Sequence, residues 1–181
     1  MHPLKHPWPV VHRPFSGEAF GSWLGRIAGR YRIGVDELVA AADINIELER
    51  EGRAWLLADV PRGEHLMRLS WACRLPTAEI EALRPPPARG AAQLCYCHHC
   101  LFLNPEDVTA PYWKRAWLYT PTAPCVLHPE SIDWVSEADL RAHRNLRKLL
   151  DFISKRRGRR EAERAWRYRP FLYASKVCGQ D

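Results

Sequence analysis

The sequence lacks long apolar runs, and this absence limits where the protein can work. Residues Met1–Phe15 contain no uninterrupted apolar stretch of about 7–15 residues, which a secretory signal needs. No window approaches the roughly 18 apolar residues of a membrane span. We therefore expect a cytoplasmic protein with no membrane partner, in a compartment where thiols stay reduced.

The common catalytic signatures are also missing. The chain has no P-loop, no H-E-x-x-H and no nucleophile elbow. "HPE", residues His128–Glu130, matches the H-x-E of zinc nucleobase deaminases, but in those enzymes the H-x-E precedes the C-x-x-C, and here it follows. We expect no enzymatic activity.

Six cysteines stand out against these absences. Cys97 and Cys100 form a C-x-x-C pair, and after 24 residues Cys125 and His128 form a C-x-x-H pair. Each short pair places two ligands on one side of an ion, and the loop between the pairs closes a tetrahedral Zn²⁺ site. Four protein ligands leave no open position, so the predicted zinc is structural. In an alternative register Cys95 replaces Cys97, although C-x₄-C is the poorer spacing.

The predicted fold class is mainly α with a small zinc-ribbon or zinc-knuckle module. With 181 residues, 46% of them hydrophobic, the chain can build a core. We expect a helical part over residues 1–90, a zinc-binding module over 91–135, and a basic amphipathic helix with a tail over 136–181.

Helical periodicity dominates the first of these parts. After an extended, unpacked arm over 1–14, apolar spacing predicts a helix capped at Ser16 and a second helix capped at Asp36. Residues 64–83 predict two short helices separated at Leu75–Thr77, an arrangement compatible with a helix-turn-helix.

Charge is concentrated near the C-terminus. Residues 1–140 hold 14 Lys/Arg against 17 Asp/Glu, whereas residues 141–169 hold 12 against 3. The segment from Asp139 to Lys155 predicts an amphipathic helix with a basic outer face, followed by "KRRGRR". Such a run is either a solvated face or a contact for phosphates, which release counterions when bound. The candidate nucleic-acid contacts are Arg144, Arg147, Lys148, Lys155, Arg156, Arg157, Arg159 and Arg160.

The loop between the two ligand pairs carries "PYWKRAWL", which combines aromatic and basic residues. Trp113 and Trp117 are four residues apart, so one helical face could dock the zinc module onto the helix that bears Trp23. Stacking on bases or contact with a partner is the alternative. We expect Lys114 or Arg115 to pair with an acidic group inside the fold. The residues assigned to packing or partner contact are Trp23, Tyr112, Trp113, Lys114, Arg115 and Trp117.

Three segments, in this order, resemble the TniQ family, which includes the TnsD target-selection proteins of bacterial transposons. "GEAFGSWLGRIA" (Gly17–Ala28) is similar to the family's opening helix, and "RLPTAEIEAL" (Arg74–Leu83) to its L-P-x-x-E-L-x-x-L segment. The segment Cys97–His128 resembles the family's zinc module. Here His98 and Val126 stand where the family usually has proline, and no second C-x-x-C follows His128.

The resemblance implies a non-catalytic adaptor of the short kind. It would recognise DNA or a CRISPR effector with its guide RNA, and it would recruit the AAA+ ATPase of a transposition machinery. The competing interpretation from the residues alone is a stand-alone, zinc-dependent regulator that binds DNA or RNA.

Overall fold

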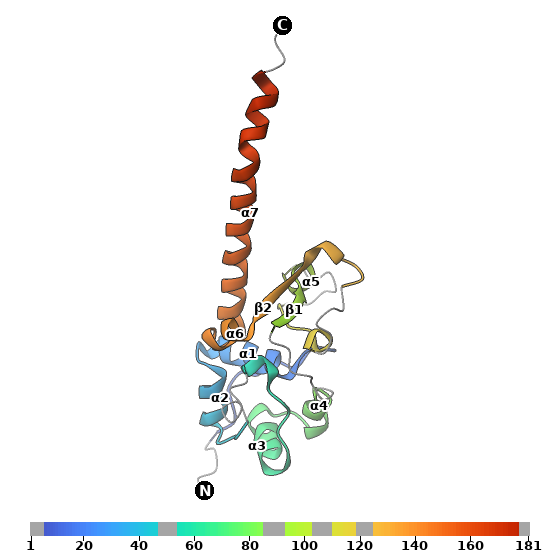
Figure 1. Cartoon of the computed structure of the whole chain (residues 1–181). Coiled ribbons are helices and arrows are strands. Elements are labelled where there is room, and N and C mark those ends of the chain that lie inside the picture. The colour runs from blue at the N-terminus through green and yellow to red at the C-terminus, as the bar shows by residue number, and fades with distance from the viewer. Residues whose placement is uncertain (1–5, 47–53, 85–92, 103–109, 119–124, 178–181) are drawn as a thin grey trace.

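The computed structural model describes residues 6–46, 54–84, 93–102, 110–118 and 125–177, with side chains described as far as residue 163. Over these ranges the chain is mainly helical, and its one sheet has two antiparallel strands (Figure 1). No described helix has both the length and the apolar composition that crossing a bilayer requires. The boundary expected at residue 90 lies outside the described residues.

Helix α1 (Phe20–Tyr31) lies at the centre of the fold because its neighbours approach it closely on a face of glycines. A Cβ atom added at Gly21 would lie 2.4 Å from the carbonyl oxygen of Trp55, in the 3-10 turn η1 (Trp55–Leu57). One added at Gly25 would lie 2.5 Å from a ring carbon of Trp55 and 3.1 Å from the nitrogen of Leu146. The spacing of four residues therefore lets η1 and the first turn of the C-terminal helix sit directly against α1.

The N-terminal helices form where periodicity predicts them, but their caps differ. Helix α1 starts after Ala19, not after Ser16. In α2 (Val35–Ala41) the cap is Gly34, whose N–H donates to Oε2 of Glu37 at 2.9 Å, and Asp36 lies within the first turn. Helices α3 (Gly63–Cys73) and α4 (Thr77–Glu81) confirm the predicted pair and its break. Whether this pair reads DNA stays a prediction.

The N-terminal arm has no helix or strand in its described part, but the expectation that it is unpacked is wrong. Trp8 is buried, and its backbone N–H donates to the carbonyl oxygen of Ala72 at 2.9 Å. The Tyr31 hydroxyl donates to the carbonyl oxygen of Val10 and accepts from its N–H. The arm's prolines favour an extended backbone, but the apolar area that the Trp8 indole removes from water stabilises the packing of this arm on the fold.

The ligand-bearing part is built on the sheet of β1 (Gln93–Cys97) and β2 (Ile132–Ser136). Helix α5 (His98–Phe102) follows β1 directly, and the 3-10 turn η3 (Pro129–Ser131) precedes β2. A further 3-10 turn, η2 (Arg115–Leu118), lies between them in sequence.

The single amphipathic helix expected from Asp139 to Lys155 is in fact two helices. Helix α6 (Glu137–Ala142) is capped by Ser136, whose hydroxyl oxygen accepts from the N–H of Asp139 at 3.1 Å. Helix α7 (Leu146–Val177) begins after Asn145, whose Oδ1 accepts from the N–H of Lys148 at 3.0 Å. The Asn145 amide also donates to the carbonyl oxygen of Ile33, so the break anchors the start of α7 to α1 and α2.

One hydrophobic core joins these elements. It runs from Trp8 in the arm, through Trp23 and Leu24 of α1, to Leu149 and Ile153 of α7. The first turns of α7 lie against α1, while its later turns extend away from the other elements (Figure 1). The basic "KRRGRR" run thus lies within a continuous helix and not beyond its end.

Candidate metal centre

Cys97, Cys100, Cys125 and His128 are brought together as the ligand spacing predicts. Cys97 is the last residue of β1, and Cys100 lies in the helical turn of α5, where its N–H donates to Sγ of Cys97 at 3.5 Å. The second pair forms a matching tight turn in which the N–H of His128 donates to the carbonyl oxygen of Cys125 at 3.2 Å. Two short turns therefore present two donors each to a common point.

The donor atoms have the spacing of a tetrahedral site. All four lie within 4.8 Å of one another. Sγ of Cys100 lies 3.5 Å from Sγ of Cys125, and Nδ1 of His128 lies 3.7, 3.4 and 3.6 Å from the three sulfurs. An ion with metal–sulfur bonds of about 2.3 Å and a metal–nitrogen bond of about 2.0 Å requires S···S near 3.8 Å and S···N near 3.5 Å. The group can therefore hold a metal ion.

As free thiols, Cys97 and Cys100 have raised pKa values, whereas Cys125 has a lowered one. Burial raises the pKa of Cys97, and it raises the pKa of Cys100 to about 12. Burial acts in the same direction on Cys125, but hydrogen bonds from Cys100 and from the N–H groups of Leu127 and His128 lower its pKa overall. Metal binding must displace the thiol protons, so occupancy is linked to pH.

The neighbouring cysteine and histidines are not ligands in this geometry. Cys95 is buried in β1 and does not belong to the four-residue group, so the described residues favour Cys97 over the alternative register. The ring of His99 stacks on that of His128 with centroids 4.0 Å apart, and His98 stacks on Phe102 at 4.6 Å. His99 thus restricts the orientation of the ligating imidazole.

The aromatic loop docks the metal module onto α1, largely through its backbone. The carbonyl oxygen of Trp113 accepts from the N–H of Ala19 at 2.9 Å, and its N–H donates to Oγ of Ser22 at 2.8 Å. The indole of Trp113 is fully buried, 5.1 Å from the ring of Tyr96 and 5.7 Å from that of Trp117. Packing of the module against the core is therefore the role of these tryptophans.

The remaining predicted packing residues surround this contact. Trp23 is fully buried in α1, and Tyr112 packs against Phe15 at 5.0 Å. The predicted helical face is a single 3-10 turn that begins at Arg115. No acidic side chain among the described residues pairs with Lys114 or Arg115; Arg115 instead donates to the carbonyl oxygen of Ala82, and Lys114 bridges Glu18 through its backbone.

The sequence reasoning missed the acid that does lie inside the fold. Glu18 is fully buried, and its carboxylate accepts from Nε and Nη2 of Arg26, both at 2.8 Å, and from Oγ of Ser22 at 3.0 Å. Ser22 in turn accepts from Trp113, which links the ion pair to the metal module. The spacing of Glu18, Ser22 and Arg26 at i, i+4 and i+8 was the available signal, since such spacing brings side chains to one side of a helix; in the structure Glu18 lies just before α1.

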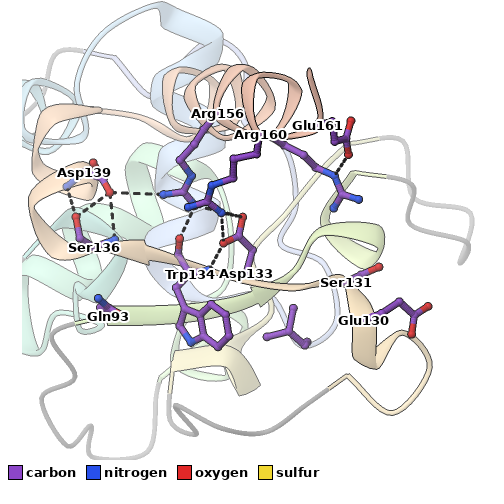
Figure 2. Close-up of a pocket in the computed structure, with 12 residues that line it drawn as sticks. Gln93, Glu130, Ser131, Asp133, Trp134, Ser136, Asp139, Arg156, Arg160 and Glu161 are labelled. Carbon is purple, nitrogen blue, oxygen red and sulfur yellow. Dashed lines mark hydrogen bonds and ion pairs between the residues drawn. The ribbon is translucent and has the colours of Figure 1, made fainter. Parts of the chain in front are cut away.

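A second missed residue is Asp133, which joins the sheet to α7 (Figure 2). Its carboxylate accepts from Arg160 at 3.0 and 3.2 Å, from Arg156 at 3.5 Å and from the Tyr96 hydroxyl at 3.2 Å. Burial would raise the pKa of Asp133, but the N–H of Trp134 and the two arginines lower it overall. Burial and the Asp133 charge raise the pKa of Tyr96 to about 12.

The eight candidate nucleic-acid residues therefore fall into two groups. Four make ion pairs within the chain: Arg156 and Arg160 with Asp133, Arg144 with Asp36 and Glu37, and Arg157 with Glu161. The other four, all exposed and without an ion pair to any described residue, are Arg147, Lys148, Lys155 and Arg159.

Neither family models, nor curated proteins, nor solved structures gave a match to this chain.

Proposed function

We propose that this protein is a non-catalytic target-selection adaptor of a bacterial transposition system, which binds nucleic acid or a targeting complex and recruits an AAA+ ATPase. The observation that carries the proposal is the meeting of the three segments that resemble the TniQ family. Gly17 of the first segment accepts from the N–H of Arg115 in the metal module at 2.7 Å, and Arg115 donates to Ala82 of the second segment. Segments far apart in the chain thus meet at Arg115.

We assign the metal as Zn²⁺ with a structural role. Three thiolates and one imidazole in tetrahedral spacing are the donors that Zn²⁺ prefers in structural sites. Four protein ligands fill the coordination sphere, so no position is left at which a substrate or an activated water could bind. This supports an adaptor over an enzyme.

Nucleic acid is the partner that the charge distribution favours. Four exposed basic side chains near the start of α7 have no acidic partner among the described residues, and the later turns of this helix extend from the body (Figure 1). Such groups add affinity through counterion release and supply no sequence choice by themselves. Target choice would then come from another surface or from a protein partner.

The test is recruitment of the ATPase encoded beside the transposase in the same genome. The zinc-loaded full chain is mixed with labelled DNA, and the ATP-dependent loading of that ATPase is measured by electron microscopy and by cosedimentation. Loading that depends on the chain supports the adaptor. A chain that shifts one promoter fragment and leaves ATPase loading unchanged is instead the stand-alone regulator.

A further inference from the structure

A pocket lies away from the metal centre, at the N-terminal end of α7. It has a volume of about 600 Å³, is open to solvent, and is lined by the N-terminal arm, the last turns of α1, Ala110–Pro111 and the first turns of α7. A volume in this range is typical of sites that take a small molecule or one unit of a polymer. None of the four metal ligands lines it.

The charged groups in this pocket are unbalanced. Arg13, Arg30 and Arg147 bring three guanidinium groups, against the single carboxylate of Asp151. Arg26 also lines the pocket, but its charge is matched by the buried Glu18. Arg30 and Arg147 are exposed and have no ion pair to any described residue, and Arg13 reaches Glu79 only at 3.8 Å with 76% of its side chain exposed. The pocket therefore favours an anionic ligand.

The walls between these charges are apolar. Phe15, Pro111, Leu146 and Leu150 supply them, from the arm, the aromatic loop and α7. An inorganic phosphate has no apolar surface to bury against such walls. A ligand with a flat apolar part beside its anionic group would bury that part against them. A nucleotide combines these two features.

Three more exposed basic groups lie further along α7, about 80–120° around the helix from Arg147 of the pocket. At 100° per residue, Lys148, Lys155 and Arg159 fall within about 40° of one another on the helix. Arg156 and Arg160, which face Asp133, lie about 60–140° around the helix from these three. The three exposed groups span about 16 Å along the helix axis. A free nucleotide could not reach them, but a strand with successive phosphates could.

We propose that this pocket holds one nucleotide of a single-stranded nucleic acid, with its phosphate between Arg30 and Arg147 and its base against Pro111 and Leu150. The strand continues along the stripe of Lys148, Lys155 and Arg159. A base in a duplex must be unstacked and unpaired before it can enter a pocket, so an unpaired strand places one there at lower cost. This inference rests on the proposed function to the extent that both require nucleic acid.

The experiment measures binding of fluorescein-labelled oligothymidylate and oligouridylate of about 20 nucleotides to the zinc-loaded full chain by anisotropy, over a range of salt. The double variant Arg30→Ala/Arg147→Ala removes the phosphate contacts. Arg62→Ala/Arg74→Ala is the matched control, since it removes two exposed arginines that have no ion pair to any described residue and lie outside the pocket and α7. The relative affinity for the two strands shows whether DNA or RNA is preferred.

The pocket variant is expected to lose about 10- to 100-fold in affinity and about 0.7 units in the log–log salt slope, for the one phosphate that the two arginines neutralise. The control should keep both values close to those of the unmodified chain. Equal losses in the two variants would mean that overall charge and not the pocket binds the strand, and would overturn the inference. Unchanged melting temperatures exclude misfolding as the cause.

An abasic strand of the same length tests the base separately. It keeps every phosphate but should bind at least about 10-fold more weakly, because it lacks the base that packs against Pro111 and Leu150. A duplex of the same sequence should also bind more weakly than the single strand. Equal affinity for all three ligands overturns the nucleotide pocket.

Two outcomes separate this inference from the proposed function. If the chain loads the ATPase on duplex DNA but the pocket variant binds single strands normally, the pocket inference fails and the adaptor stands. If no nucleic acid binds and polyglutamate does, through Arg30 and Arg147, the site takes an acidic peptide and the inference is overturned. A chain that binds no nucleic acid and loads no ATPase contradicts both proposals.

Discussion

Cys97 stands directly opposite Ile132 in the antiparallel pair of β1 and β2. Cys97 belongs to the group that can hold a metal ion, and Ile132 is followed by Asp133, which accepts hydrogen bonds from two arginines of α7. His128 precedes Ile132 by four residues, with the turn η3 between them. The four-residue group, the strand pair and α7 are therefore connected by one continuous path of contacts.

This path predicts what removal of one ligand does. Cys100→Ala should abolish stoichiometric metal binding and melt the strand pair, because a structural metal supplies much of the folding free energy of such a module. Metal content by elemental analysis and thermal melting measure the two effects. Cys95→Ala is the control: it removes a buried thiol two residues from Cys97 and should keep the metal. Loss of metal from both variants would favour the alternative register.

Asp133→Asn should lower the free energy of unfolding by about 2 kcal/mol, since it weakens charge-assisted hydrogen bonds to Arg156 and Arg160. The pKa of Asp133 is lowered below its ordinary value of 3.8. Its contribution is therefore present above that value and is lost as the pH falls through the folded-state pKa. Denaturant unfolding between about pH 5 and pH 7 should show a constant difference between variant and parent.

The double variant Asp133→Asn/Arg160→Met tests whether the pair carries this difference. If the two residues interact, the combined loss should be smaller than the sum of the single losses. Additive losses would place the stabilisation of α7 elsewhere, at Asn145 or in the apolar contacts with α1.

The ligand set could be predicted because it depends on short-range spacing. Cys97 and Cys100, like Cys125 and His128, are two residues apart within their pairs, and a tight turn is sufficient to present each pair. The helices of the N-terminal half follow local periodicity in the same way. Only the meeting of the two pairs in space depends on tertiary structure, and it is expected because both pairs have the same two-residue spacing between ligands.

The partners of the basic residues could not be predicted, since these contacts join distant parts of the chain. Arg144 pairs with Asp36, 108 residues away, and Arg160 with Asp133, 27 residues away. From the sequence alone, both arginines are expected to face solvent or to contact phosphates. The break before α7 was hidden for a related reason: the apolar pattern continues through it, and Asn145 ends the continuity by bonding Ile33 across the fold.

The glycine face of α1 gives a prediction with an internal control. Gly25→Ala should destabilise the protein by about 1–3 kcal/mol, because the new methyl group would meet the Trp55 ring and the backbone of Leu146. Gly158→Ala, in α7, meets no atom within 4 Å and should stabilise the helix by about 0.5–1 kcal/mol. Denaturant unfolding compares the two changes. A neutral Gly25 variant would show that α1 and α7 can separate at little cost.

The buried ion pair of Glu18 and Arg26 gives the last prediction. Glu18→Ala should destabilise the protein by about 3 kcal/mol or more, because it leaves the Arg26 guanidinium, 7% exposed, without its counter-charge. It also frees Ser22, whose hydroxyl positions Trp113, so the metal module should loosen on α1. Fluorescence of the buried tryptophans reports that loosening, and unfolding titrations report the stability.

Replacing both partners separates the charge from the packing. Glu18→Gln/Arg26→Met removes both charges and keeps the side-chain volumes close to the original, so it should recover much of the stability lost in Glu18→Ala. If the double variant is as unstable as Glu18→Ala, the carboxylate stabilises the junction through Ser22 and the N–H of Phe15, and not mainly by neutralising Arg26. The metal content of the two variants distinguishes a loosened module from a lost one, since the four ligands lie outside this network.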